Sequence, residues 1–97
     1  MTTSGGGASD EQVAKDVETY IRENVKELPE TKTPSDNFLS GVQAEDGKVR
    51  VVTYLNDGLP ADHAAAKEIC RAVEQASVEG VEETTIVDAG DTDMERC

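Results

Sequence analysis

Only three side chains in this sequence are thiols or imidazoles, the groups that most often act as nucleophiles or zinc ligands. They are Cys70, Cys97 and His63, and the two cysteines lie far apart with no CxxC spacing. A zinc or iron–sulfur site within one chain needs about four ligands. The sequence therefore predicts no cofactor and no self-contained metal site. Cys70 and Cys97 remain weak candidates for a metal site built between two chains.

Asp62 and His63 are neighbours in the first turn of a predicted helix. In a functional interpretation, His63 binds a metal together with Asp62 or carries a proton. In a structural one, Asp62 interacts with the positive end of the helix dipole and His63 is an exposed polar residue. We favour the structural interpretation. We also expect Cys70 to be a small buried hydrophobic residue of the same helix.

No set of residues typical of an active site is present. The sequence has no Ser/His/Asp grouping, and its one glycine run comes before any predicted strand, so it is not a phosphate-binding loop. Glu82 and Glu83 are adjacent on a predicted strand and point to opposite faces, so they cannot form an acid–base pair. The sequence therefore predicts a protein that is not an enzyme.

Charge further limits the function. The 97 residues contain 21 Asp and Glu against 9 Lys and Arg, which gives a net charge of −12. Such a surface predicts no binding to nucleic acid and none to an anionic membrane, because both require clustered cations. High acidity with only 3% aromatic residues indicates a salt-adapted protein, whose repelling carboxylates are screened by salt. The alternative is an ordinary acidic domain, or one that folds only on binding.

The start of the chain shows no targeting signal. Residues 1–8 contain no Lys or Arg and no apolar run, so we expect a disordered tail and a cytoplasmic protein. The last residues, 90–97, are polar and acidic, and we expect a flexible tail there too. A single domain is predicted between them, over residues 9–89.

Hydrophobic spacing predicts five elements in that domain. An apolar stripe with Ser9 as N-cap predicts a helix over 10–28, ended by Pro29. The alternating apolar pattern on either side of Asp46-Gly47 predicts a hairpin over 38–55. A helix is expected over 60–76, starting at Pro60, and a strand over 81–87. The fold class is α+β, an αββαβ two-layer sandwich with a small three-stranded mixed sheet and two helices on one face.

Residues spread from Val13 to Val87 carry a resemblance to a known family. They are Gly41-Val42 and Asp46-Gly47-Lys48-Val49-Arg50-Val51 in the hairpin, Gly58-Leu59-Pro60-Ala61-Asp62, Arg71-Ala72-Val73-Glu74, and Gly80-Val81-Glu82. In order and spacing they resemble the small iron–sulfur cluster assembly domain that precedes the Mrp ATPases and occurs alone in SufT-type assembly factors. The alternative is that αββαβ is a frequent small architecture and the match is generic.

One departure from that family affects the expected function. Its members typically have Pro-Gly-Cys-Pro at the turn into the second helix, where the helix dipole lowers the pKa of the thiol. The matching residues here are Asp57-Gly58-Leu59-Pro60, so Leu59 stands in place of the thiol. The resemblance therefore implies a scaffold that has lost its own cluster ligand.

Three functional hypotheses remain open. The first is a non-enzymatic accessory or adaptor domain related to iron–sulfur cluster assembly. It would bind a protein partner, such as an assembly component, through an open sheet edge or through a turn comprising Asp57, Gly58, Leu59, Pro60, Asp62 and His63. The second is a metal or cluster carrier that uses Cys70 or Cys97 between chains. The third is a generic interaction domain. In each case we expect a monomer or a weak dimer.

Overall fold

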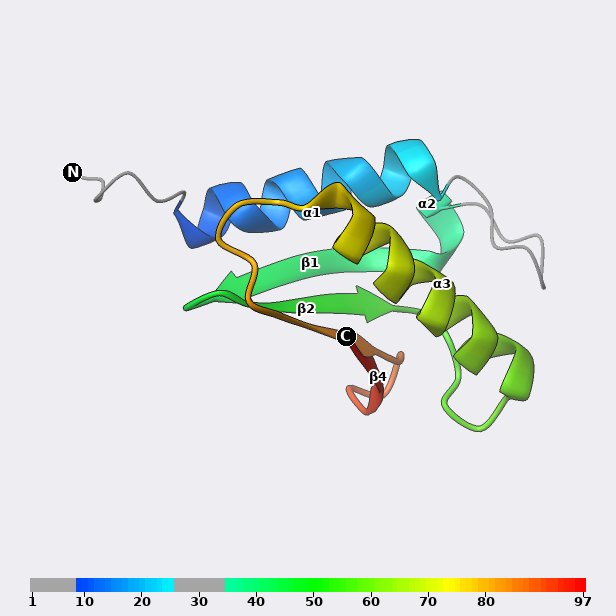
Figure 1. Ribbon diagram of the computed structural model, residues 1–97. Helices are drawn as coiled ribbons and strands as arrows, with labels where there is room; N and C mark the ends of the chain where they lie inside the picture. The colour runs from blue at the N-terminus through cyan, green and yellow to red at the C-terminus, as the bar shows by residue number, and fades with distance from the viewer. Residues whose placement is uncertain (1–8, 26–34) are drawn as a thin grey trace.

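The computed structural model describes residues 9–25 and 35–97 (Figure 1). The expected tail 1–8 and residues 26–28 lie outside this part of the chain. The first helix, predicted to extend to residue 28, ends at Asn24 with Val25 as its C-cap. The elements are α1 (Asp10–Asn24), α2 (Ser35–Phe38), β1 (Leu39–Glu45), β2 (Lys48–Thr53), α3 (Pro60–Ala76), β3 (Glu83–Val87) and β4 (Asp93–Arg96). The α+β class is confirmed, with four strands in the described sheet where three were predicted.

The sheet is mixed and its strands follow the order β1-β2-β3-β4. β1 and β2 form an antiparallel hairpin, α3 connects β2 to the parallel strand β3, and β4 returns antiparallel to β3. Because β2 and β3 are parallel, the loops that follow them emerge at the same end of the sheet. This topology brings together the turn before α3 and the loop before β4.

Helix α1 begins where the sequence places its cap. The Ser9 hydroxyl accepts a hydrogen bond from the N–H of Gln12 at 3.1 Å, which satisfies one of the free donors of the first turn. Val13, Val17 and Ile21 form the buried stripe of the helix. The predicted helical face therefore packs on the sheet.

The hairpin turn depends on residues that tolerate positive φ. Asp46 and Gly47 have φ of 50° and 83°, the combination that suits a two-residue turn between twisted strands. A Cβ atom on Gly47 would lie 2.6 Å from a carboxylate oxygen of Glu82. Glycine is therefore favoured here mainly by its positive φ, since the exposed Glu82 side chain can move to make room.

A short helix, α2, includes the first residue of the predicted hairpin. Residue 38 was expected to begin a strand, but Phe38 ends α2 and its side chain is 1% exposed. Its carbonyl still accepts a hydrogen bond from the N–H of Tyr54 at 2.9 Å. The local chain turns here because burial of the one phenylalanine outweighs continuation of the strand.

The two long helices cover one face of the sheet, with α1 over β1 and α3 over β3 and β4 (Figure 1). Helix α3 has the predicted limits, and its buried face is made mostly of small residues, including Ala65, Ala66 and Ala72. Small side chains allow a helix to lie close to a sheet. The core residues are Val13, Val17, Ile21, Val25, Phe38, Leu39, Val49, Val51, Leu55, Ala65, Ala66, Ile69, Cys70, Ala72, Val73, Ile86 and Met94.

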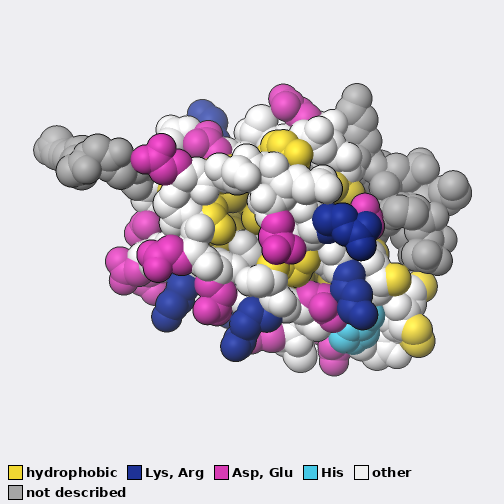
Figure 2. All heavy atoms as spheres, in the orientation of Figure 1, with side chains coloured by type: hydrophobic (Ala, Val, Ile, Leu, Met, Phe, Trp, Pro, Cys, Tyr) yellow, Lys and Arg dark blue, Asp and Glu magenta, His cyan; other side chains and the backbone are white. Residues whose placement is uncertain are grey.

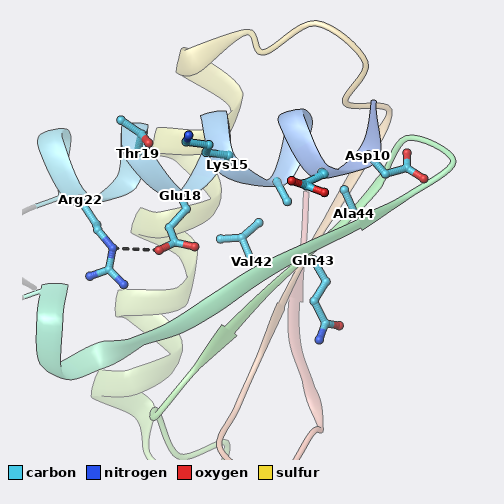
Figure 3. A pocket seen from close by; sticks show the side chains of 10 residues that line it. Asp10, Lys15, Glu18, Thr19, Arg22, Val42, Gln43 and Ala44 are labelled. Atoms are coloured by element: carbon cyan, nitrogen blue, oxygen red, sulfur yellow. Dashed lines mark hydrogen bonds and ion pairs between the residues drawn. The ribbon is translucent and has the colours of Figure 1, made fainter. Parts of the chain in front are cut away.

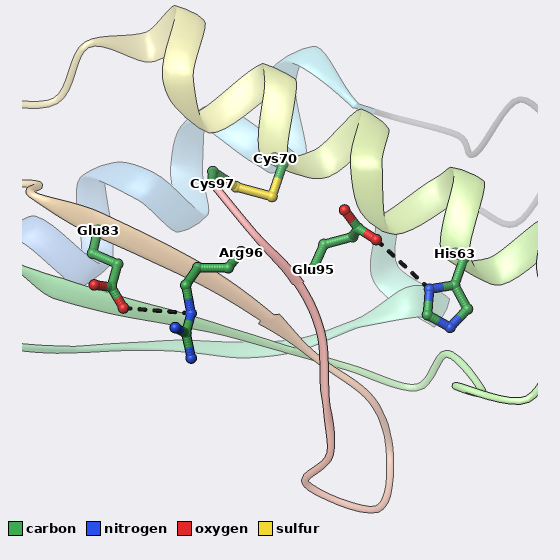
Figure 4. The surroundings of a disulfide bond; sticks show 6 residues. All are labelled: His63, Cys70, Glu83, Glu95, Arg96 and Cys97. Carbon is green, nitrogen blue, oxygen red and sulfur yellow. Dashed lines mark ion pairs between the residues drawn. A yellow bond between two sulfur atoms is a disulfide. The ribbon is translucent and has the colours of Figure 1, made fainter.

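The C-terminal residues correct the prediction of a flexible tail over 90–97. Residues 93–96 form β4 on the edge of the sheet, and Met94 is buried. Cys97 forms a disulfide with Cys70 of α3, with the two Cα atoms 5.7 Å apart (Figure 4). Acidic composition indicated a solvated end, but strand pairing and the disulfide hold this segment against the domain.

None of the helices in the described part of the chain combines the length and the apolar character needed to cross a membrane.

Candidate functional site

The candidate site is the β2–α3 turn, residues 54–63, which lies at the carboxyl ends of β2 and β3. The hydroxyl of Thr53, at the end of β2, donates to the carbonyl of Val87 at the end of β3, at 2.7 Å. Just beyond, the N–H of Ala89 donates to the carbonyl of Leu55 at 3.1 Å. These bonds fix the turn against the loop that precedes β4.

Side-chain hydrogen bonds give the turn its shape. The Asn56 side chain accepts from the N–H of Gly58 at 2.9 Å, and the Asn56 carbonyl accepts from the N–H of Leu59 at 3.1 Å. A carboxylate oxygen of Asp62 accepts from the N–H of Asn56 at 2.8 Å, and Asp62 is buried. Asp62 thus connects the start of α3 to the turn. Its carboxylate is directed at a backbone N–H group, whereas a metal ligand at this surface would be directed at solvent.

His63 lies between two carboxylates. Its Nε2 atom is 2.7 Å from the carbonyl oxygen of Asp57 and 3.0 Å from that residue's carboxylate. Its Nδ1 atom faces Glu95 of β4 at 3.7 Å (Figure 4). The two ring nitrogens face opposite sides, so these groups do not meet at one point. Within residues 9–25 and 35–97, no three His, Cys, Asp or Glu side chains form a metal-binding group.

Leu59 precedes Pro60, the first residue of α3, and its side chain points out of the domain. Leu59 is 50% exposed and Tyr54 is 62% exposed, the two large hydrophobic residues of the described chain with high exposure. Figure 2 shows hydrophobic side chains gathered beside His63, over the start of α3. The turn therefore presents an apolar side chain at a rigid position, where the sequence predicted a partner surface.

The loop before β4 contains a carboxylate that sequence reasoning missed. Asp88 accepts hydrogen bonds from the N–H groups of Thr92 at 2.7 Å and Gly90 at 2.8 Å. The bond from Thr92 is the main cause that holds the pKa of Asp88 below its usual value, while burial acts in the opposite direction. An Asp followed by Gly at i+2 is the signal that could have identified this Asx-type loop.

The cysteines are not available as ligands in this structure. Their sulfur atoms are bonded to each other, so neither offers the thiolate that metal binding needs. The carrier hypothesis that uses Cys70 and Cys97 between chains is therefore not supported. The even number of cysteines is the only signal of this bond in the sequence, because the proximity of the two residues depends on β4 lying beside α3.

Comparison of the chain with protein-family models, with curated proteins and with solved structures finds no match. A functional proposal therefore rests on the geometry of the β2–α3 turn. It combines a fixed backbone, a protruding leucine and acidic side chains that are engaged in local hydrogen bonds and ion pairs.

Proposed function

We propose that this protein is a non-enzymatic accessory domain that binds a protein partner through the β2–α3 turn. The observation that carries the proposal is the exposure of Leu59, 50% at the start of α3. Protein interfaces gain much of their affinity from a few large side chains that are desolvated at the centre of the contact. Because Asn56 and Asp62 already hold the turn in one conformation, little conformational entropy is lost when a partner buries Leu59.

The partner class that the sequence resemblance suggests is a component of iron–sulfur cluster assembly, in the cytoplasm. Leu59 stands where the resembled domains have a thiol, and the position is exposed here. A leucine at the exposed position of the cluster ligand keeps a surface that a partner can contact, but it cannot bind a cluster as the thiol does. An accessory role, in which another protein supplies the cluster ligands, accounts for both features, and the domain itself would act as a monomer or weak dimer.

The test is direct binding between the full chain and purified iron–sulfur scaffold and carrier proteins from the same organism, measured by titration calorimetry. The Leu59→Ser variant should weaken the binding by about tenfold or more, since it removes a buried apolar side chain from the contact. Ala64→Ser is the matched control, because it makes the same kind of change on the exposed face of α3 one turn further on. Absence of binding, or equal binding by Leu59→Ser, would contradict the proposal.

A further inference from the structure

A groove of about 550 Å³ runs between α1 and the outer edge of β1 (Figure 3). Its floor consists of small or branched apolar side chains, Ala14 of α1 with Val42 and Ala44 of β1, all half-buried. Figure 3 shows Val42 and Ala44 directed toward α1, while Gln43 points away from it. The groove is thus bounded by a helix on one side and a strand on the other.

β1, the strand that bounds the groove, is an edge strand of the described sheet. The two-residue turn makes Glu45 and Lys48 a hydrogen-bonded pair, and such pairs alternate along an antiparallel ladder. Gln43 therefore bonds to Arg50, whereas the N–H and C=O groups of Val42 and Ala44 point away from β2. Among the described residues, the backbone groups left unpaired thus belong to the same two residues whose side chains form the floor.

The two edges of the sheet differ in how they are protected. β4 is short, carries Asp93, Glu95 and Arg96, and is fixed to α3 by the Cys70–Cys97 disulfide. Charge and short length are common protections of an edge strand. β1 is seven residues long, with no charged residue before Glu45 and no proline. It therefore remains competent to pair with another strand from Gly41 onward, beyond the bulge at its start.

The charges around the groove select the kind of segment that fits. Asp10 and Glu11 lie at one end of its wall, and neither has an ion pair with any residue in the described part of the chain. Glu18 is already paired with Arg22 at 3.1 Å. Lys15 also lines the groove, but its side chain points away from β1 (Figure 3), so the Asp10 and Glu11 end attracts a strand with a basic side chain. A second copy of this chain, with its charge of −12, is repelled.

We propose that β1 pairs with an extended, basic peptide segment of a partner protein, which lies in the groove beside α1. Backbone hydrogen bonds to Val42 and Ala44 hold the segment, its apolar side chains contact the floor, and a Lys or Arg faces Asp10 and Glu11. Strand addition of this kind obtains affinity from the backbone and specificity from alternate side chains. The surface shares no residue with the β2–α3 turn, so either proposal can fail without the other.

The probe is a capped seven-residue peptide whose alternate positions, those that face α1, are valine with one lysine at the end nearest Asp10, and whose other positions are threonine. It is titrated into the full ¹⁵N-labelled chain. The amide signals of Val42 and Ala44 should shift, and their hydrogen exchange should slow, because both N–H groups become hydrogen-bonded. The same peptide N-methylated at alternate residues is the control, since it keeps every side chain and loses the backbone donors. Equal binding by the methylated peptide, or shifts centred on another surface, would overturn the proposal.

Two variants separate the groove from general attraction to an acidic protein. Ala44→Lys places a cation in the groove and should weaken peptide binding by about tenfold or more through like-charge repulsion. Gln75→Lys makes the same change in charge on the exposed side of α3 and should leave binding nearly unchanged. Equal loss in both variants would show charge attraction alone and would refute strand addition. Absence of any binding to the unmodified chain would refute it as well.

Discussion

At the scale of single residues, Leu59 and Asp88 lie at the same end of the sheet and differ in what their side chains contact. Leu59 is exposed at the N-terminus of α3, the positive end of the helix dipole. Asp88, at the end of the neighbouring parallel strand, uses its carboxylate to bind the N–H groups of its own loop. One residue is thus available for contact, and the other keeps the surrounding backbone in place.

The Leu59→Cys variant should fold normally, because half of the leucine side chain is already in solvent. The new thiol should titrate slightly below the value of about 8.5 for a free cysteine, since the helix N-terminus favours the thiolate and Asp57 and Asp62 oppose it. The measurement is the pH dependence of iodoacetamide alkylation under non-reducing conditions. Gln75→Cys, near the C-terminus of the same helix, is the control and should react more slowly at neutral pH. A buried, unreactive thiol in the first variant would refute the exposed turn.

Asp88 should contribute stability that depends on pH. Its folded-state pKa is lowered, so the contribution is present above the unfolded value, near 3.9, and is lost as the pH falls through the lower folded value. Asp88→Asn keeps an acceptor oxygen but removes the charge, so its melting temperature should fall less than that of the wild type between pH 5 and about pH 2.5. Parallel melting curves over this range would contradict the assignment.

At the scale of elements, the short strand β4 depends on a covalent bond. Three of its four residues pair with β3, and the disulfide at Cys97 attaches the strand to α3 (Figure 4). The same strand supplies Glu95, which faces His63 of the β2–α3 turn at 3.7 Å. The disulfide therefore supports the candidate site as well as the sheet edge.

Cys97→Ser should lower the free energy of unfolding by about 2–4 kcal/mol, because it removes the loop closure between positions 70 and 97. The loss should be local first, with faster amide exchange in β4 than in β1 and β2. Urea denaturation and native-state hydrogen exchange give the two quantities. Cys70→Ser is the matched variant and should behave alike, whereas uniform loss of protection across the sheet would contradict a local role for the disulfide.

At the scale of the whole molecule, the surface charge predicts how stability should respond to salt. The net charge of −12 on 97 residues produces repulsion between carboxylates, and few cations are present to offset it. Ion pairs such as Arg50 with Asp91 and Arg96 with Glu83 lie on the exposed surface. Exposed pairs of this kind contribute little. We therefore expect screening by salt to be the main way in which the repulsion is relieved.

The melting temperature should therefore rise as sodium chloride is increased from low to about molar concentration, where the screening length falls to about 3 Å. Sucrose at matched osmolality is the control, because it is excluded from the protein surface and raises stability in that way but adds no ions. A melting temperature that is independent of salt, or one that rises equally in sucrose, would remove the argument for salt adaptation.

Local features of this fold could be predicted from the sequence because their causes are close along the chain. Pro60 and the apolar spacing after it determine α3, Ser9 caps α1, and Asp46-Gly47 determines the hairpin turn. Each depends on contacts within a few residues. The position of the β2–α3 turn, and of Leu59 within it, followed from the same local rules.

Only the tertiary structure decided the features that join distant residues. β4 forms because β3 offers an edge and α3 offers Cys70, neither of which is visible in an acidic C-terminal sequence. Burial of Asp62, the approach of Glu95 to His63 and the groove beside β1 likewise require the packed layers. The physical reason is that pairing and burial depend on which surfaces meet, and a carboxylate or a cysteine has the same sequence signature whether it meets a partner or water.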